Sequence, residues 1–288
     1  MTTPIALTIA GSDSSGGAGI QADLKTFAAL GVYGASAITA LTAQNTKGVR
    51  GIHAVPAEFV TAQIDAVFSD LDVKAVKIGM VAQLASIDAI AASLVRWSPK
   101  HVVLDPVLVA TSGDRLLATD AVERLRTGLI PLASLITPNL PEAAALLDEP
   151  IASDEAAIER QGRQLLALGC PAVLIKGGHG QGSESIDYLV RSHGTLALPA
   201  PRIATKIPTA PAARCRQQSP PAWPKARILK ARCVTPRSSS VPRSRRPIAL
   251  VSAMVTGRSI IFIDFIEGGD MSPLILRRRQ RVARMRAR

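Results

Sequence analysis

The sequence predicts an α/β fold in which helices cover a mostly parallel sheet. Up to residue 206, short β-type runs alternate with longer segments of helical periodicity, which is typical of such a sheet. Polar residues follow the predicted strands, at the positions where open parallel sheets carry their ligand sites. The chain has 288 residues, 47% of them hydrophobic, which is ample for a packed core.

Strands and helices are predicted in alternation along this part of the chain. The predicted strands cover residues 5–10, 33–42, 75–79, 101–104, 135–137 and 172–176. Residues 19–30 form a helix after a glycine-rich turn, and the next helix places Phe59, Ile64, Val67 and Phe68 at helical spacing. Pro141 suits the first turn of a later helix. The predicted helices cover residues 19–30, 57–70, 85–97, 119–128, 141–147 and 154–168.

The composition of the chain changes abruptly after Lys206. Residues 1–206 hold 16 Lys and Arg against 19 Asp and Glu, whereas residues 207–288 hold 18 against 3. The second segment also holds 9 of the 20 prolines and shows little of the periodicity of a packed domain. We therefore predict an incomplete α/β domain over residues 1–206 and a basic Pro/Arg-rich tail over residues 207–288.

Several classes of protein are excluded by composition. The first residues carry no basic and apolar leader, and no apolar run is long enough to cross a bilayer, so a cytoplasmic protein without a membrane partner is expected. Cys170, Cys215 and Cys233 form neither an even disulfide framework nor a metal-ligand spacing. We interpret Cys170 as a small buried apolar residue.

Two of the strand ends carry residues suited to a small polar ligand. After the first strand comes Ala-Gly-Ser-Asp-Ser-Ser-Gly-Gly-Ala-Gly, in which Gly11 lets a ligand approach the backbone and Asp13 can accept a hydrogen bond. No Gly-Lys-Ser/Thr follows, so this is not a Walker A loop, and a tight strand-to-helix connection is the ordinary explanation. After the second strand, the Gln44 amide offers both a donor and an acceptor, which matches the edge of an aminopyrimidine. A lone Gln is usually a polar loop residue.

Three later strand ends carry charged residues suited to phosphate chemistry. Asp105 and Glu142 follow neighbouring strands and could share a magnesium ion, which takes only one or two protein carboxylates. Helix capping is the ordinary alternative. Lys176 ends a strand and precedes two glycines, a combination that fits nucleotide phosphates, although such a lysine is more often a solvated charge. Five polar signals at successive strand ends are difficult to attribute to packing.

Six segments together resemble one enzyme family. They are Thr-Ile-Ala-Gly-Ser-Asp-Ser-Ser-Gly-Gly-Ala-Gly-Ile-Gln-Ala-Asp at 8–23, Thr-Ala-Gln-Asn-Thr at 42–46, Lys-Ile-Gly-Met at 77–80, Asp-Pro-Val at 105–107, Ile-Thr-Pro-Asn-Leu-Pro-Glu-Ala at 136–143 and Lys-Gly-Gly-His at 176–179. The family is the hydroxymethylpyrimidine/phosphomethylpyrimidine kinase of thiamin biosynthesis, within the ribokinase-like superfamily. The resemblance covers nearly all of residues 4–206.

The resemblance implies a fold, a reaction and a set of site residues. It implies a ribokinase-like three-layer α/β/α fold, often dimeric, and ATP-dependent phosphorylation of 4-amino-5-hydroxymethyl-2-methylpyrimidine and its monophosphate. Asp105 and Glu142 would position magnesium, Asn139 and Lys176 would meet the ATP phosphates, and Lys176 would be catalytic. The residues expected to hold the pyrimidine are Gly11, Asp13, Gln44, Met80 and Val107.

The resemblance fails after Lys206. The family continues with Asn-Thr-His-Gly-Thr-Gly-Cys-Thr, a glycine turn whose backbone N–H groups form the anion hole. This chain has Ile-Pro-Thr-Ala-Pro-Ala-Ala-Arg at 207–214. No glycine remains, the two prolines have no N–H to donate, and Ala213 stands where the family has cysteine. Cys215 lies two positions out of register.

The tail is explained by a shifted reading frame. Codons read from the third base of the present frame permit the whole family motif after Lys206. In that shifted frame, the codons of Trp223 and Pro224 can only encode Ala, and the surrounding codons permit an apolar helix of small residues. Near the end, Met254 forces a glycine within a Gly-His-rich stretch that resembles the family's carboxyl terminus. Our hypothesis is that the tail is a family coding segment translated one base out of frame, so the carboxyl-terminal helices are expected to be missing or disordered.

Three alternatives to an active pyrimidine kinase remain open. The basic tail would bind polyanions with strong salt dependence, but it has few aromatic residues and no recognition motif, so no specific nucleic-acid partner is expected. A non-catalytic pyrimidine binder would keep the strand-end residues without the anion hole. A pyridoxal-type kinase would act on a related hydroxymethyl compound, although Gln44 and the Gly11–Gly19 loop favour the pyrimidine.

Overall fold

The computed structural model describes residues 3–45, 48–81, 83–108, 119–177, 184–201, 264–265 and 271–272. The altered segment at 207–214 and nearly all of the predicted tail lie outside these residues. The frame break and the loss of the carboxyl-terminal helices therefore stay predictions. Within the tail, two short strands, β10 (Asp264–Phe265) and β11 (Met271–Ser272), pair antiparallel.

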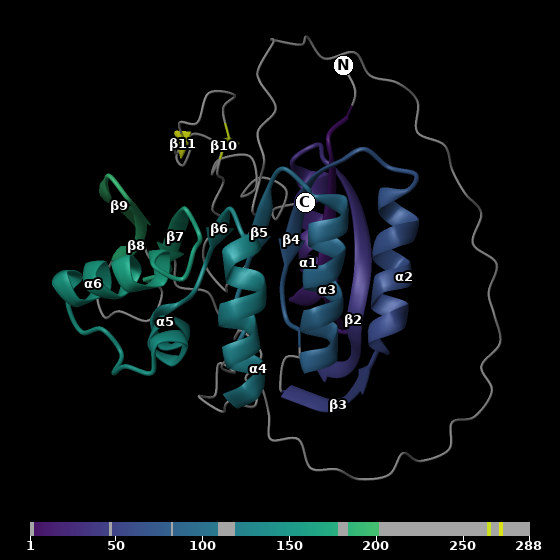
Figure 1. Cartoon of the computed structure of the whole chain (residues 1–288), viewed down its shortest axis with the longest axis horizontal. Coiled ribbons are helices and arrows are strands. Elements are labelled where there is room, and N and C mark those ends of the chain that lie inside the picture. The colour runs from purple at the N-terminus through teal and green to yellow at the C-terminus, as the bar shows by residue number, and fades with distance from the viewer. Residues whose placement is uncertain are drawn as a thin grey trace.

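A single nine-stranded sheet, in the order β3-β2-β1-β4-β5-β6-β7-β8-β9, forms the centre of the described part (Figure 1). The six strands from β2 to β7 in this order pair in parallel, and the pairs β2–β3, β7–β8 and β8–β9 are antiparallel. All six predicted strands are present. The strand bounds are β1 Ile5–Asp13, β2 Tyr33–Asn45, β3 Gly48–Ala54, β4 Val73–Ile78, β5 Val102–Leu104, β6 Leu135–Ile136, β7 Ala172–Ile175, β8 Glu184–Arg191 and β9 Gly194–Pro201.

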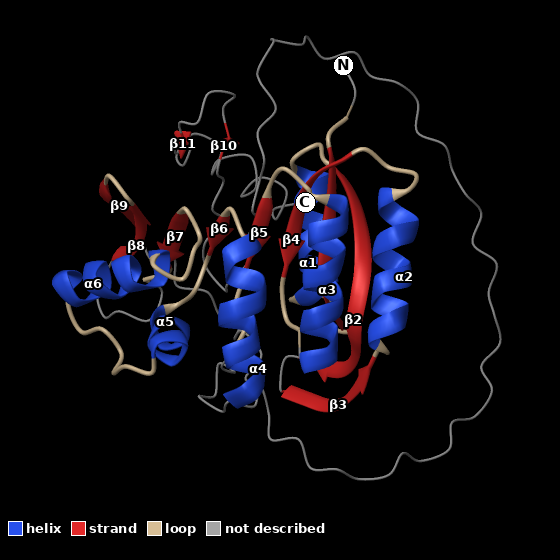
Figure 2. Cartoon of the chain, in the orientation of Figure 1, coloured by secondary structure: helices blue, strands red, loops and turns tan. Residues whose placement is uncertain are grey.

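All six predicted helices are also present, and they connect the parallel strands. Figure 2 shows α2, α3 and α4 side by side across the sheet. Helix α4 continues through a π-helical turn at Leu125–Leu129 into a 3-10 turn at Ile130–Leu132. The helix bounds are α1 Gly19–Ala29, α2 Ala57–Phe68, α3 Leu84–Trp97, α4 Thr119–Arg124, α5 Leu140–Leu147 and α6 Glu155–Leu166.

The central strands are buried on both faces. In β5, Val102 and Leu104 belong to a large cluster with residues of α2 to α6, whereas Val103 between them belongs to a second cluster on the opposite face. Helix α1 packs on that opposite face through Phe27, against Ala6 and Ala75. Burial on both faces explains why these strands are continuous apolar runs, and each fully buried large side chain stabilises the fold by about 1.5–3 kcal/mol.

Three strands of this sheet were not predicted: β3, β8 and β9. All three are antiparallel strands at the margins of the sheet. They mix apolar residues with polar ones, so their sequences lack the continuous apolar character of the parallel strands. Phe59 also differs from expectation, since it is 60% exposed while Ile64 is fully buried. Five residues correspond to about 140° around a helix, which places Phe59 off the buried face.

Two expectations from composition, on membrane-spanning helices and on Cys170, can be compared with the structure. Among the described residues, no helix combines the length and apolar character needed to cross a bilayer. Cys170 is buried, as predicted, and burial raises the pKa of its thiol to about 11, so the thiol stays protonated at neutral pH.

Candidate functional site

The carboxyl ends of six parallel strands meet along one edge of the sheet, and every predicted site residue lies there. β1 is flanked by β2 on one side and β4 on the other, so successive crossovers leave it in opposite directions. Such a switch point is where open α/β sheets bind ligands. β1 and β2 run further than predicted, so Gly11, Asp13 and Gln44 lie within the last three residues of strands rather than in loops.

A buried cluster of three charges lies at one part of this edge. Lys176 Nζ is 3.2 Å from Asp105 Oδ1 and 3.6 Å from Glu142 Oε2. The three side chains are 6%, 10% and 4% exposed. They come from the end of β7, the end of β5 and the first turn of α5, so only the folded sheet brings them together. The Lys176 ammonium is therefore buried and paired, and it is not a solvated charge, which is the more common role of a lysine at a strand end.

The start of α5 holds Glu142 in a fixed position. Asn139 is the N-cap, and its side chain accepts a hydrogen bond from the Glu142 N–H at 2.8 Å. Glu142 Oε2 accepts in return from the Asn139 N–H at 2.8 Å, which completes a capping box. The Lys176 N–H donates to the Pro138 carbonyl at 2.8 Å, which ties β7 to the same turn. Helix capping, the ordinary role of these residues, is thus present, and it also preorganises the cluster.

The protonation of Glu142 is unusual for a carboxylic acid. Burial raises its pKa to about 7, opposed by the Lys176 ammonium and assisted by the nearby Asp105 carboxylate. The Asn139 N–H also favours the charged form. Glu142 therefore exchanges its proton close to neutral pH, which is a property common at functional sites.

The glycine-rich loop after β1 is organised by Asp13. Its carboxylate accepts hydrogen bonds from the backbone N–H groups of Ser15, Gly17 and Ala18 at 2.8–2.9 Å, and from the Ser15 hydroxyl. The side chain is 3% exposed. The backbone N–H groups of the turn before α1, which could bind an anion, thus bind the Asp13 carboxylate. This use of the carboxylate leaves it little capacity for a direct contact with a ligand.

Of the residues predicted for the pyrimidine, Gly11 and Met80 contact each other, whereas Gln44 and Val107 contact other residues of the same edge. A Cβ built on Gly11 would lie 2.7 Å from Met80 Cε, so these two residues are in contact. The Ser14 hydroxyl donates to the Gln44 carbonyl at 2.7 Å and accepts from the Gln44 N–H at 2.8 Å. These two bonds fix the end of β2 to the glycine-rich loop. Val107 is half-buried just after Asp105, and its N–H donates to the Asp105 carbonyl.

Glycine is required at the start of α1. Gly19 has a φ of +56°, and a Cβ there would lie 2.2 Å from the Gly11 carbonyl oxygen. The close approach of these two backbones closes the loop over the end of β1.

Two buried groups next to the site were not assigned by sequence reasoning. Asp23 Oδ2 accepts from Thr8 Oγ1 at 2.6 Å and from Lys77 Nζ at 2.8 Å, and all three side chains are largely buried. Asp187, on β8, accepts from the Gly177 N–H at 2.8 Å. The available signal was a charged residue within an apolar run, which by itself does not reveal the partner.

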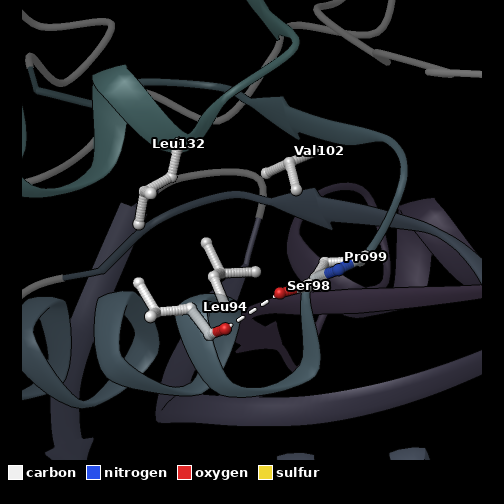
Figure 3. Close-up of a pocket in the computed structure, with 6 residues that line it drawn as sticks. Leu94, Ser98, Pro99, Val102 and Leu132 are labelled. Carbon is white, nitrogen blue, oxygen red and sulfur yellow. Dashed lines mark hydrogen bonds between the residues drawn. The ribbon is translucent and has the colours of Figure 1, made fainter.

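The cavity drawn in Figure 3 is not part of this edge. It measures about 340 Å³ and is lined by Leu94, Val95, Ser98, Pro99, Val102 and Leu132. Val102 begins β5, whereas Asp105 follows the last residue of that strand, so the cavity lies at the opposite end of the strand. Its lining holds no titratable side chain, and it offers no chemistry for a polar substrate.

Asp105 and Glu142 fit a magnesium ion. Within the described ranges, no group of three His, Cys, Asp or Glu side chains is placed to hold a metal. Magnesium keeps most of its waters and needs only one or two carboxylates, which this pair supplies. The Asp105 carboxylate raises the pKa of Glu142 and the Lys176 ammonium lowers it more, and a divalent cation would add to the positive charge that Lys176 already places at this pair.

Comparison with known proteins links this geometry to one family. The family model described as phosphomethylpyrimidine kinase matches residues 13–208. The hydroxymethylpyrimidine/phosphomethylpyrimidine kinase of Rhizobium meliloti is 59% identical over 204 residues, which are 71% of this chain and 76% of the relative.

Solved structures support the same link. The phosphomethylpyrimidine kinase of Clostridium difficile matches with a TM-score of 0.64 and 48% identity, over 68% of this chain and 84% of that one. The pyridoxal kinase of Bacillus subtilis, in an ADP complex, matches with a TM-score of 0.66 and 34% identity, over 71% of this chain and 78% of that one. The prediction of a ribokinase-like α/β fold is confirmed by these matches.

Proposed function

Because the chain belongs to the phosphomethylpyrimidine kinase family, we propose that it is built to phosphorylate 4-amino-5-hydroxymethyl-2-methylpyrimidine and then its monophosphate, using ATP, in thiamin biosynthesis. The observation that carries this proposal is the buried cluster of Lys176, Asp105 and Glu142 at the sheet edge that also holds the glycine-rich loop. Phosphoryl transfer needs alignment of two substrates and neutralisation of charge on the moving group, and this edge has residues for both.

The phosphates are assigned to the charged part of the edge. Lys176 would hold them through its ammonium, and Asn139 lies beside it at the N-terminus of α5, where backbone N–H groups favour anions. Asp105 and Glu142 would hold magnesium, which when bound neutralises phosphate oxygens. In this arrangement the carboxylates position the metal and Lys176 is the catalytic residue that stabilises negative charge as it moves.

The pyrimidine is assigned to the other part of the edge. Gly11 and Met80 would provide a contact surface, Val107 an apolar wall, and the Gln44 amide a donor and an acceptor for the aminopyrimidine edge. Asp13 would act by holding the shape of the loop, because its carboxylate already accepts four hydrogen bonds from the loop.

The activity of the chain as written is proposed to be impaired. Residues 1–206 would form the kinase domain and residues 207–288 would be an out-of-frame tail. The family match stops at residue 208, two residues after the abrupt change in charge and proline content. The glycine turn that supplies anion-hole donors in the family has no counterpart at 207–214.

A pyridoxal-type kinase is the second candidate, since the B. subtilis pyridoxal kinase matches with a TM-score of 0.66. Titration calorimetry of the chain with the pyrimidine and with pyridoxal separates the two. We expect the pyrimidine to bind at least about fivefold more tightly, because a mismatched polar group at Gln44 loses about 1–3 kcal/mol. Gln44→Met should remove that preference, and Ser153→Ala, on an exposed loop, should keep it. Tighter binding of pyridoxal would favour the second candidate, and binding of neither would count against both.

The raised pKa of Glu142 predicts a pH dependence for magnesium. Magnesium affinity should be constant above about pH 7 and fall by up to about tenfold per pH unit below it, because the ligand must lose its proton. Calorimetric titration with Mg²⁺ between pH 5.5 and 8.5 measures this dependence. Glu142→Gln should bind Mg²⁺ more weakly and without the inflection near pH 7. An unchanged inflection in that variant would show that another group is responsible.

The same pKa shift predicts the opposite trend for stability. The unfolded side chain loses its proton near the ordinary value of 4.5, whereas the folded one keeps it to about 7. Between these values the folded state binds more protons, so the contribution of Glu142 to stability is complete below pH 4.5 and falls as the pH rises through 7. Magnesium binding and ligand-free stability therefore change in opposite directions across the same window.

A further inference from the structure

Strand β7 leaves its antiparallel partner at the residue that carries the phosphate-binding charge. The ladder pairs Ile175 with Tyr188, so its continuation would place Lys176 opposite Asp187 on β8. Successive N–H groups of a strand point to opposite sides, and that of Lys176 points to the side of β6, where it donates to the Pro138 carbonyl at 2.8 Å. The next N–H, that of Gly177, donates to the Asp187 side chain at 2.8 Å. A carboxylate thus replaces main-chain pairing at the end of this strand.

The position of Gly177 is fixed by close packing as well as by this bond. A Cβ built on Gly177 would lie 1.7 Å from the Ile186 carbonyl oxygen and 2.7 Å from the carbonyl carbon. The backbone of Gly177 therefore lies directly against the peptide that precedes Asp187. Together, the packing and the hydrogen bond determine the direction in which the chain leaves Lys176.

Asp187 is an unusual residue for this position. It is 7% exposed and is the only charged residue among the residues of β8 that are described as buried. Burial raises its pKa, while the Gly177 N–H and the Lys176 ammonium favour the charged form. A β-branched apolar residue would stabilise a buried strand without the cost of desolvating a carboxylate. Strand formation therefore does not explain a carboxylate at position 187. The hydrogen bond that this carboxylate accepts from Gly177, beside Lys176, does explain it.

We propose that Asp187 is a positioning residue for Lys176. Its carboxylate holds the Gly177 N–H and so fixes the Lys176–Gly177 backbone, which keeps Lys176 Nζ between Asp105 and Glu142. This inference rests on the proposed function, in which that ammonium meets the nucleotide phosphates. It adds a residue from an antiparallel strand to a site otherwise built from the ends of the parallel strands.

Calorimetric titration of the full chain with Mg·ATP and, separately, with adenosine tests the proposal. Asp187→Val fills the same volume without an acceptor and should weaken ATP binding by about tenfold to a hundredfold, the value of a hydrogen bond to a charged group. Adenosine binding should change by less than about twofold, since adenosine has no phosphate. Asp187→Asn keeps an oxygen that can accept from Gly177 and should stay within about threefold of the parent chain.

Asp154 provides the matched control. Its carboxylate accepts from the Ala157 N–H at 2.8 Å, the same kind of bond, at the N-cap of α6. Asp154→Val should leave the ratio of ATP to adenosine affinity unchanged. If Asp187→Val does not fold, as judged by thermal unfolding, Asp187→Ser takes its place, because the shorter side chain retracts from Gly177.

The outcomes separate the inference from the function on which it rests. Equal weakening of ATP and adenosine, or parent-like ATP affinity without the acceptor, would overturn the positioning role while leaving the proposed function intact. An Asp187→Asn variant as weak as Asp187→Val would also overturn it, since the hydrogen bond would then not be the cause. A parent chain that binds adenosine no more weakly than Mg·ATP would overturn both, because Lys176 would then contribute nothing to phosphate binding.

Discussion

A chain whose reading frame is restored by one inserted base after the Lys206 codon is expected to phosphorylate the pyrimidine at least about a thousandfold faster than the chain as written. The segment at 207–214 has no glycine and two prolines, so it lacks the N–H donors of the family's anion hole. Loss of a single oxyanion donor slows an enzyme by roughly 100-fold to 1000-fold, and here the whole turn is replaced. Coupled measurement of ADP release from both chains, under the same conditions, checks this expectation.

Two controls make that comparison specific. Insertion of two bases at the same position puts the tail in the third frame and should restore nothing. A Lys176→Met substitution in the repaired chain should abolish the gain, which shows that the activity depends on the charged cluster. Rapid ATP-dependent phosphorylation by the chain as written would contradict both the frame hypothesis and the importance of the missing turn. A coding sequence that does not decode to the family motif in the shifted frame would remove the frame hypothesis alone.

The parallel part of the fold was predictable from sequence because its strands are buried on both faces. Val102, Val103 and Leu104 are all nearly inaccessible, and such runs of apolar residues differ clearly from helical periodicity. The marginal strands gave no comparable signal. β3 contains two glycines, an arginine and a histidine in seven residues, and it is a strand because β2, including the part beyond its predicted end, supplies a partner.

The candidate site was predictable in its location but not in its internal contacts. Residues at the ends of parallel strands must share one edge, so the proximity of Asp105 to Lys176 follows from the order of elements. Sequence could not show that Asp13 would direct its carboxylate into its own loop, since that depends on the turn geometry. Nor could it identify Asp187, because the strand that carries this residue was not predicted and its partner is a backbone N–H.

The second large effect concerns stability and follows from burial of the same cluster. Lys176→Met should destabilise the chain by about 3–5 kcal/mol at pH 8, because Asp105 and Glu142 then remain buried without their compensating charge. Urea unfolding of the parent and the variant measures the difference. At pH 6 the loss should be smaller, since burial already raises the pKa of Glu142 to about 7, removal of the Lys176 ammonium raises that pKa more, and the group is then protonated.

A surface pair gives the matched comparison for this prediction. Arg163 and Glu159 lie 2.7 Å apart but are 60% and 37% exposed, so Arg163→Met should destabilise the chain far less than Lys176→Met. Combining Lys176→Met with Glu142→Gln should recover part of the loss at pH 8, because the second change removes one of the stranded charges. If Lys176→Met were as stable as the parent at pH 8, the variant could not be holding Asp105 and Glu142 as buried charges without a partner. The role of Lys176 as the charge that compensates Asp105 and Glu142 would then be contradicted.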